Sequence, residues 1–169
     1  MLCIIAKLDD AAVKRLTSIR ESALTEEAAI KPLYGHITIA AYSGNNEAGF
    51  VQDCKKLLAD ISPFSVKYTD IEVLWETSII IARPETTLEL KTIHQLITEK
   101  YNDSLNQWTK KGAWYPHTTL FYEPQSDLRG LCSRMAESFV PFSTIINRIE
   151  FSTVTEAGYR IIDSMRLRS

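Results

Sequence analysis

The sequence Tyr34-Gly35-His36-Ile37-Thr38-Ile39 returns in the second half of the chain as Tyr115-Pro116-His117-Thr118-Thr119-Leu120. Both stretches read Tyr-x-His-x-Thr-apolar, and together they contain two of the three histidines in the chain. In an extended strand, residues two apart face the same side, so each copy presents an imidazole and a hydroxyl on one face while Ile37 or Thr118 turns away. Two such strands could bring two His-Thr pairs together.

Other short matches between the two halves recur at a nearly constant spacing. At an offset of 78 residues the chain repeats Pro63-Phe64-Ser65 as Pro141-Phe142-Ser143, Ile71-Glu72 as Ile149-Glu150, and Cys54 as Cys132. The motif histidines are 81 residues apart (117 minus 36), and a change of loop length between each motif and the helix after it would absorb the difference. We interpret the chain as an internal duplication with pseudo-twofold symmetry. One bilobal domain over residues 1–169 is expected, with pseudo-repeats of about 1–76 and 77–169.

Apolar periodicity predicts the same order of elements in both halves: strand, helix, His-containing strand, helix, strand. The predicted helices are residues 10–24, capped by Asp9-Asp10; a helix with Phe50, Cys54, Leu57, Leu58 and Ile61 inward; a helix opened by Pro84 and the capping box Thr86-x-x-Glu89; and a helix with Leu128, Leu131, Cys132 and Met135 inward. The predicted strands are residues 2–8, the two motifs, 64–74 with a bulge near Thr69-Asp70, 78–82, and 142–167 turned into a hairpin by Glu156-Ala157-Gly158. This pattern favours an α+β fold: two largely antiparallel sheets with flanking helices and a central groove that carries both His-x-Thr strands.

Composition and charge narrow the possible functions. A net charge of −2 and a pI of about 5.9 argue against a protein that coats duplex nucleic acid, because that task needs a broad basic surface. The cysteines Cys3, Cys54 and Cys132 form neither a disulfide framework nor a zinc spacing, and they suit a reducing compartment. No apolar run approaches the ~20 residues of a membrane helix, and the first residues lack the basic region of a signal peptide. We therefore expect a cytoplasmic protein that does not insert into membranes.

Two imidazoles that face each other across a groove are suited to acid–base chemistry. Their unperturbed pKa of about 6.5 allows one ring to take a proton while the other gives a proton to a leaving oxygen. The hydroxyls of Thr38 and Thr119 could hold the non-bridging oxygens of a phosphate. This chemistry needs no metal and no cofactor, and two histidines lack the further ligands of a zinc site. His94 has no threonine two residues later and borders the apolar side of a helix, so we exclude it from the site.

The paired motifs His36-Ile37-Thr38-Ile39 and His117-Thr118-Thr119-Leu120 resemble those of the 2H phosphoesterase superfamily, which includes 2′,5′ RNA ligase-like and cyclic phosphodiesterase proteins. The resemblance covers the whole chain through its length and duplicated layout. It implies a bilobal α+β fold and a metal-independent phosphodiesterase that hydrolyses 2′,3′-cyclic phosphates or 2′,5′-type bonds of nucleotides or RNA ends. It also implies catalytic roles for His36, Thr38, His117 and Thr119. Where some members carry a basic residue two places after the motif threonine, this chain has Ala40 and Phe121.

Three aromatic residues are candidates for contact with the substrate. Tyr34 and Tyr115 stand two residues before each motif histidine, so they share its facing and could line the groove or donate to a phosphate. Strand alternation puts Phe121 on the face of His117, where it could stack on a nucleobase or belong to the core. Local positive potential at the groove mouth could come from six residues: Lys31, Lys110, Lys111, Arg160, Arg166 and Arg168.

The favoured function is therefore a phosphodiesterase that acts on a nucleotide or RNA end. It is expected to be a monomer, since a site between internal repeats needs no second chain. The alternative is a non-catalytic module that binds nucleotides or RNA ends in the same groove, and a third interpretation is a structural duplication without a ligand. The presence of both histidines and both threonines favours the enzyme, because a binding module could lose one of them. The sequence leaves open the substrate, the direction of the reaction and which histidine is the base.

Overall fold

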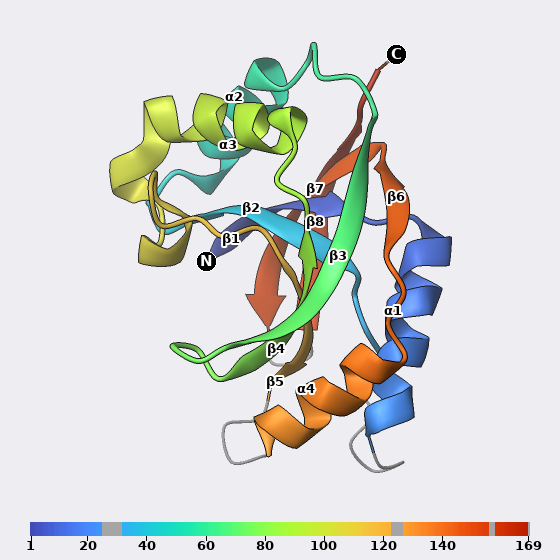
Figure 1. Ribbon diagram of the computed structural model, residues 1–169. Helices are drawn as coiled ribbons and strands as arrows, with labels where there is room; N and C mark the ends of the chain where they lie inside the picture. Colours follow the sequence, from blue (N-terminus) through green and yellow to red (C-terminus); the bar gives the residue numbers. More distant parts are fainter. Residues whose placement is uncertain (25–31, 123–126, 156–157, 169) are drawn as a thin grey trace.

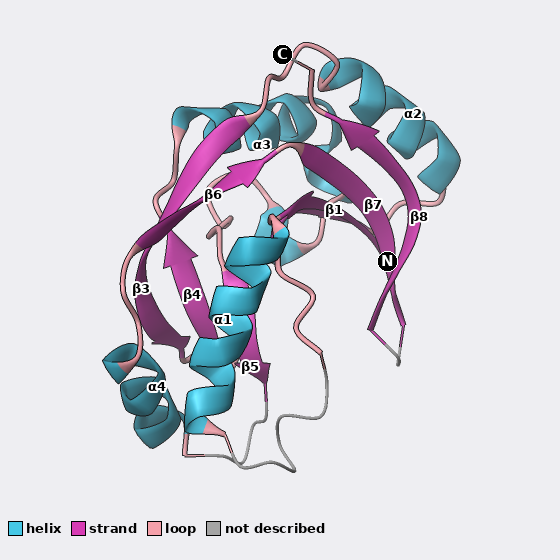
Figure 2. Cartoon of the chain, turned by 90° about the vertical axis from the view of Figure 1, so that its right-hand side faces the viewer, coloured by secondary structure: helices cyan, strands magenta, loops and turns pink. Residues whose placement is uncertain are grey.

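The chain forms two four-stranded antiparallel sheets with helices packed against them (Figures 1 and 2), which confirms the predicted α+β fold. This computed structural model describes residues 1–24, 32–122, 127–155 and 158–168. The strands are β1 Leu2–Lys7, β2 His36–Tyr42, β3 Phe64–Leu74, β4 Ile79–Pro84, β5 Thr118–Tyr122, β6 Phe142–Ile146, β7 Arg148–Thr155 and β8 Gly158–Arg166. The helices are α1 Asp10–Ala23, α2 Glu47–Leu57, α3 Leu88–Tyr101 and α4 Leu128–Glu137, with short 3-10 helices at Asn102–Ser104 and Gln107–Thr109. The strand orders are β2-β1-β7-β8 and β5-β4-β3-β6.

Strands from both halves of the chain contribute to each sheet. In one sheet β1 pairs with β2 on one side and with β7 on the other, and β7 pairs with β8. β3 belongs to the other sheet and lies between β4 and β6. β3 and β6 pair antiparallel, with Phe64 opposite Ile146 and Val66 opposite Thr144. Val66 and Thr144 are also equivalent in the repeat, since 66 plus 78 is 144. The pseudo-twofold axis therefore passes through this pair, and the halves of the sequence exchange strands around it.

The helices of each half likewise pack against elements of the other half. α1 packs against α4 and against β5 and β6 of the second sheet, whereas α3 packs against β2 of the first sheet and against α2. Figure 1 shows α1 beside α4 at one end of the molecule and α2 beside α3 at the other. All four helices bury side chains in one continuous apolar core, among them Leu16, Phe50, Ile93 and Met135. Burial of these apolar faces therefore needs both halves, and it supplies the main driving force for folding.

Both motif strands contain a β-bulge directly after the motif threonine. The pairing of β2 with β1 skips Ile39, and the pairing of β5 with β4 skips Leu120. These residues are equivalent, 81 positions apart (120 minus 39). A bulge bends its strand and interrupts the alternation of side chains. The rule that side chains two residues apart share a face therefore holds from the motif histidine to the motif threonine but not beyond the bulge. It does not by itself show on which face Phe121 lies.

The offset between equivalent residues of the two halves changes from 81 to 78 after the second helix of each half. Asn46 caps α2 ten residues after His36 (46 minus 36), and Asp127 caps α4 ten residues after His117 (127 minus 117). In both cases the cap side chain accepts a hydrogen bond from the backbone N–H three residues later. The expected change of loop length between motif and helix is therefore wrong, because the caps start both helices at the same distance. The loops that follow the helices differ instead, with residues 58–63 in one half and 138–141 in the other.

The remaining predicted elements agree closely with the structure. Asp9 caps α1, and the register of β3 with β4 shifts between Tyr68 and Asp70, as the predicted bulge requires. α3 is capped by Thr87 rather than Thr86, and its hydroxyl accepts from the N–H of Leu90. The extended finish divides into three strands, of which β7 and β8 pair antiparallel. In the predicted turn Glu156-Ala157-Gly158, the first two residues lie outside the described residues.

Cys54 and Cys132 differ in their surroundings. The helix caps make Cys54 equivalent to Met135 (54 plus 81), so the equivalence of the two cysteines expected from the offset of 78 is wrong. Cys54 and Met135 are both fully buried. Cys132 is half-buried, and its thiol donates to the carbonyl of Ile71 at 3.8 Å.

Replacement of these cysteines by serine tests this difference. Cys54→Ser is expected to lower the free energy of unfolding by about 1 to 3 kcal/mol, because a polar hydroxyl replaces a thiol that packs as an apolar group. Cys132→Ser should cost less, since its hydroxyl keeps the carbonyl of Ile71 and access to solvent as partners. Urea unfolding followed by circular dichroism measures both values. Equal losses for the two variants would contradict the difference in packing.

Candidate active site

The two motif histidines are held by identical local hydrogen bonds. His36 begins β2 and His117 immediately precedes β5. The Nδ1 of His36 lies 2.5 Å from the carbonyl oxygen of Tyr34, and the Nδ1 of His117 lies 2.7 Å from that of Tyr115. Because a carbonyl oxygen only accepts, Nδ1 carries the proton in both rings. Each Nε2 is then the basic nitrogen, and among the described residues neither has a hydrogen-bond partner.

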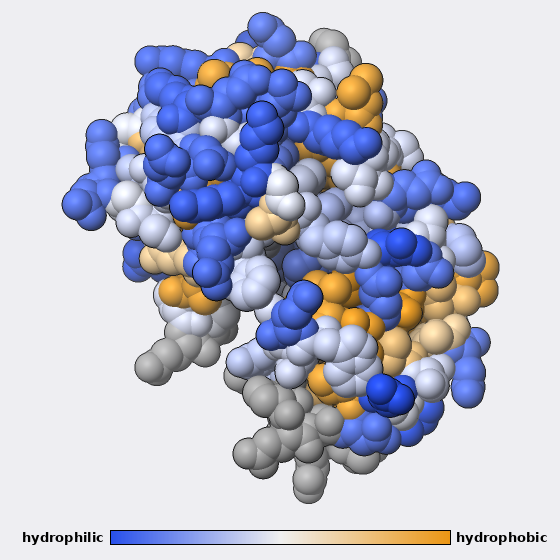
Figure 3. All heavy atoms as spheres, turned by 60° about the vertical axis from the view of Figure 1, so that its left-hand side comes forward, coloured by the Kyte–Doolittle hydropathy of each residue, from blue (hydrophilic) through white to orange (hydrophobic). Residues whose placement is uncertain are grey.

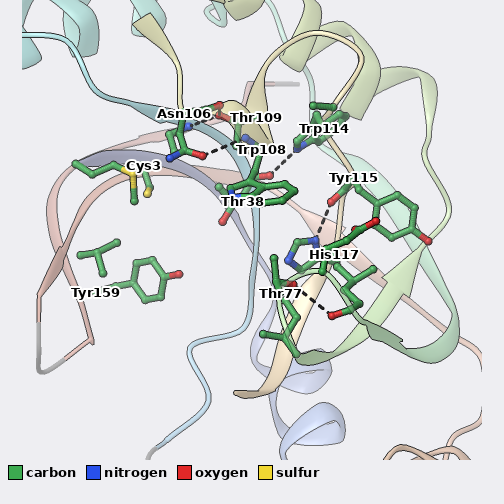
Figure 4. Close-up of a pocket in the computed structure, with 17 residues that line it drawn as sticks. Cys3, Thr38, Thr77, Asn106, Trp108, Thr109, Trp114, Tyr115, His117 and Tyr159 are labelled. Carbon is green, nitrogen blue, oxygen red and sulfur yellow. Dashed lines mark hydrogen bonds between the residues drawn. The ribbon is translucent and has the colours of Figure 1, made fainter. Parts of the chain in front are cut away.

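Two adjoining cavities bring the four motif residues together. The His117 cavity, of about 580 Å³, is lined by His117 and Thr38, and the His36 cavity, of about 570 Å³, is lined by His36 and Thr119. Each cavity thus combines the histidine of one motif with the threonine of the other. Tyr159 lines both cavities. Figure 3 shows one face of the molecule hollowed between two protruding parts, and Figure 4 shows Tyr159 across the His117 cavity from His117.

Buried hydrogen bonds join the two motif strands, although the strands belong to different sheets. The Oγ1 of Thr118 donates to the carbonyl of His36 at 2.8 Å, and the hydroxyl of Tyr68 lies 2.5 Å from the same Oγ1. Since Thr118 has only one hydroxyl proton, Tyr68 is the donor in the second bond. The Nε1 of Trp114 donates to the carbonyl of Thr38 at 2.8 Å (Figure 4). These bonds fix the two motifs relative to each other.

The predicted substrate residues Tyr34 and Tyr115 line the cavities, but their hydroxyls are engaged by glutamates. The hydroxyl of Tyr34 donates to Glu150 at 2.5 Å, and that of Tyr115 donates to Glu72. Burial raises the pKa of both phenols, and the neighbouring glutamates raise it further, so both hydroxyls stay protonated. Glu72 and Glu150 are repeat equivalents (150 minus 72 is 78). The tyrosine carbonyls orient the histidines while the glutamates hold the tyrosines.

A basic residue lies beside each motif histidine. Lys7 is directly opposite His36 in the pairing of β1 with β2. Extension of the pairing between β4 and β5 by one residue puts Arg83 opposite His117. Neither residue was predicted from the sequence, although a short repeat at an offset of 76 (83 minus 7) marks them: Ile4-Ile5-Ala6-Lys7 and Ile80-Ile81-Ala82-Arg83.

Six cations were expected at the groove mouth, and the structure describes five of them. None of the five that the structure describes lines either cavity: Lys110, Lys111, Arg160, Arg166 and Arg168. The sixth, Lys31, lies outside the described residues. Arg20 of α1, which the sequence did not single out, lines the His36 cavity.

Burial makes both motif histidines weaker bases. It lowers the pKa of His36 to about 4; the bond to its carbonyl partner opposes this shift, and Lys7 and His117 reinforce it. Burial also lowers the pKa of His117, and the carbonyl bond and Glu72 oppose that shift. Both rings are therefore neutral at pH 7 in the free protein.

Two aromatic side chains border the His36 cavity. Phe121 lines it and also packs against the core, so the two interpretations of this residue are compatible. The ring of Tyr159 meets that of His36 edge-on, with 4.4 Å between centroids, and stacks on Tyr34 at 5.9 Å. Tyr159 was missed because it reaches the site through long-range strand pairing, and no local motif marks it.

The third histidine, His94, packs outside both cavities. His94 is buried, lines neither cavity and shares a hydrogen bond with the carbonyl of Thr109 at 2.9 Å. Its ring stacks on Trp114 with 4.3 Å between centroids. Because Trp114 holds the carbonyl of Thr38, His94 belongs to the packing that supports the motif strands.

The side chains that commonly bind metal ions were searched for clusters. Within residues 1–24, 32–122, 127–155 and 158–168, no three His, Cys, Asp or Glu side chains form a group suited to hold a metal ion. In the same ranges no helix has the length and apolar character needed to cross a membrane.

Comparisons with known proteins relate this fold to a family. The family model of the 2′-5′ RNA ligase superfamily matches residues 8–156. The crystal structure of E. coli LigT in apo form is 14% identical, with a TM-score of 0.67 over 99% of this chain and 97% of LigT. The crystal structure of a phosphoesterase is 14% identical, with a TM-score of 0.69 over 99% of this chain and 98% of that protein. A comparison with curated proteins gives no match.

The family model spans most of the sequence, and the similarity to the solved structures extends over nearly the full length of both chains. The described residues form two four-stranded sheets and four helices, and this fold is similar to that of the solved structures. The chain therefore belongs to the 2′-5′ RNA ligase superfamily of 2H phosphoesterases.

Proposed function

We propose that the protein is a metal-independent phosphodiesterase that hydrolyses 2′,3′-cyclic phosphates or 2′,5′-type phosphodiester bonds of nucleotides or RNA ends. One observation carries this proposal. Two adjoining cavities each combine the histidine of one motif with the threonine of the other, and both Nε2 atoms lack a partner among the described residues. Further support comes from LigT, which has been crystallised with NADP⁺, ATP, 3′-AMP and phosphate.

In the proposed reaction, a phosphate lies between His36 and His117. One neutral ring takes a proton from water through Nε2, and the water oxygen attacks phosphorus. The other ring, in its protonated form, gives a proton to the leaving oxygen. The hydroxyls of Thr38 and Thr119 hold the non-bridging oxygens as negative charge builds on them. A 2′,3′-cyclic phosphate gives one product, with a phosphomonoester and a free hydroxyl on the same ribose, whereas a 2′,5′-type bond gives a phosphomonoester and a separate alcohol. No group outside the protein, the substrate and water takes part.

The proposed substrate is a single nucleotide or an RNA end, and extended duplexes are not proposed as substrates. Phe121 is proposed to stack on the base, because it lines the cavity that also contains His36 and Thr119. The protein is proposed to act as a monomer, since one chain supplies both cavities. A cytoplasmic location agrees with three free cysteines.

Replacement of the motif residues tests paired catalysis. His36→Ala and His117→Ala are each expected to lower kcat by roughly 10² to 10⁴, the usual contribution of a general acid or base. The double variant should be little slower than the slower single variant, because both rings act on one phosphate. Thr38→Val and Thr119→Val should lose less, since proton transfer remains intact. Turnover is measured on nucleoside 2′,3′-cyclic phosphates and on 2′,5′-linked dinucleotides.

The control for these variants is Lys56→Ala, at an exposed position of α2, which should keep the turnover of the unmodified protein. Circular dichroism establishes that each variant is folded. A folded variant that lacks one motif histidine and still turns over at a near-normal rate would overturn paired catalysis.

Chelation tests independence from metals. Activity is expected to persist after long incubation with excess EDTA and removal of the chelator by gel filtration, because side chains of the protein supply the acid, the base and the hydroxyl donors. The rate is compared before and after treatment. Loss of activity that Zn²⁺ or Mn²⁺ restores would refute the metal-independent mechanism.

Titration by NMR tests the state of the two rings. In the free protein His36 has a pKa of about 4, and the pKa of His117 is lowered from 6.5. Inorganic phosphate is expected to raise both values, because an anion beside Nε2 favours the charged ring. Long-range ¹H–¹⁵N spectra at pH 7 should also show both rings protonated on Nδ1. An Nε2–H tautomer in either ring, or unchanged pKa values at saturating phosphate, would contradict the proposed site.

A further inference from the structure

A further cavity, of about 370 Å³, is lined mainly by α3 and by Lys111, Gly112 and Trp114. This α3 cavity contains neither motif histidine, and it shares Trp114 with the His117 cavity. Figure 4 shows Trp114 at the border of the His117 cavity, where its Nε1 donates to the carbonyl of Thr38. Trp114 is therefore a common wall of the candidate active site and the α3 cavity.

His94 is a buried polar side chain that lines the α3 cavity, with 8% of its surface exposed. Its Nε2 lies 2.9 Å from the carbonyl oxygen of Thr109, and a carbonyl only accepts, so Nε2 carries the proton and Nδ1 is an acceptor. Within the described ranges of the chain, this Nδ1 has no hydrogen-bond partner. Burial lowers the pKa of His94, and the carbonyl bond opposes the shift, so the ring is neutral at pH 7 and Nδ1 keeps its lone pair.

Thr98 is the second buried polar side chain of this cavity, with 4% of its surface exposed. Its hydroxyl donates to the carbonyls of His94 at 3.0 Å and Gln95 at 3.1 Å, both within α3. The single proton of the hydroxyl is therefore used, and Oγ1 can only accept a further bond. The buried side of the cavity thus presents two acceptors, and a ligand that fills it has to bring hydrogen-bond donors.

Two lysines line the exposed side of the α3 cavity. Lys91 of α3 and Lys111 are both exposed, and neither ammonium group has a carboxylate partner in the part of the chain that the structure describes. By contrast, Lys55, Lys67 and Lys100 each pair with a carboxylate. Two cations on one cavity, with no carboxylate among its described lining residues, favour an anionic ligand.

The backbone of Gly112 adds a donor on the same side. Its N–H has no partner among the described residues, and its φ of 84° lies in the left-handed region. A Cβ built at this position meets nothing within 4 Å, so the backbone is open to a ligand. The glutamates of α3, Glu89 and Glu99, are exposed and do not line the cavity, and Glu99 accepts from the amide of Gln95 at 2.7 Å.

We propose that the α3 cavity is a second ligand site, which binds a small phosphate monoester that carries free hydroxyl groups, such as a sugar phosphate. Lys91, Lys111 and the N–H of Gly112 bind the phosphate on the exposed side. Hydroxyl groups of the ligand donate to Nδ1 of His94 and Oγ1 of Thr98 on the buried side. This site is separate from the phosphodiesterase groove, and the proposal does not rest on the function proposed for that groove.

Other classes of ligand fit the α3 cavity less well. A metal cation would be repelled by Lys91 and Lys111. An apolar ligand would leave the acceptors of the buried side without a donor, which costs free energy. A volume of about 370 Å³ suits a small molecule rather than a polynucleotide.

NMR titration with ribose 5-phosphate tests the site. The chain contains only three histidines, so the Cε1–H signal of His94 reports on the α3 cavity while those of His36 and His117 report on the groove. His36→Ala and His117→Ala assign the three signals. Ribose 5-phosphate is expected to move the His94 signal in a saturable way. Ribose without phosphate should bind roughly tenfold more weakly or worse, because it lacks the charged hydrogen bonds to the lysines.

Charge removal tests the exposed side of the site. The double variant Lys91→Met, Lys111→Met is expected to weaken the binding read from His94 by roughly tenfold or more, while the signals of His36 and His117 respond as in the unmodified protein. The matched control is Lys56→Met, Lys110→Met, which removes the same charge at residues that do not line the cavity. This control should bind ribose 5-phosphate as tightly as the unmodified protein.

Removal of one acceptor tests the buried side. Thr98→Val keeps the shape of the side chain, and it is expected to weaken binding of ribose 5-phosphate by about threefold to tenfold, the usual worth of one hydrogen bond. Binding of inorganic phosphate, which brings no sugar hydroxyl, should stay the same.

The outcomes decide the proposal independently of the groove. A His94 signal that ribose 5-phosphate leaves in place, or equal losses in the lysine pair and its control, would overturn the site. Equal affinity for inorganic phosphate and ribose 5-phosphate, with no effect of Thr98→Val, would overturn the assigned ligand class. Absence of phosphodiesterase turnover would refute the proposed function and leave the α3 site standing.

Discussion

The hydroxyl of Thr118 is the contact on which the geometry of the candidate site depends most directly. It accepts a hydrogen bond from Tyr68 and donates one to the carbonyl of His36, so it links a strand of one sheet to a strand of the other. Thr118 and Tyr68 are almost fully buried, and a buried polar group without its partner costs free energy. The core therefore holds the two motifs at a fixed separation. Trp114 adds a second bond of the same kind, to the carbonyl of Thr38.

Local patterns in the sequence were sufficient to predict most of the elements and to single out the four motif residues, which line the two cavities. The His-x-Thr spacing follows from the two-residue period of a strand, and the helix caps follow from side chains that accept backbone N–H groups. Strand exchange could not be predicted in this way, because the pairing of β3 with β6 is set by contacts distant in sequence. Tyr159 was missed for the same reason.

Other parts of the site were visible in the sequence but were not recognised. Glu72 and Glu150 had been matched as repeat equivalents, yet only the structure shows that each binds a motif tyrosine. Lys7 and Arg83 follow a repeated Ile-Ile-Ala sequence whose offset of 76 differs from those of the other matches. Short changes in loop length separate these offsets, so a single alignment offset could not reveal all of the equivalent residues. In the structure, the strand registers and the helix caps identify the equivalent residues separately for each strand and helix.

The pairing of β3 with β6 through Val66 and Thr144 has the self-complementary form of a contact between two identical subunits. In a homodimer of one half, every residue near the axis would appear twice, and a change at one site would be imposed on the other. Fusion of the halves into a single chain removes that constraint. The chain can then carry Asp70 at one position and Arg148 at its equivalent, which no symmetric dimer can do. Covalent linkage thus lets two sites of common ancestry evolve independently while they remain on one rigid framework.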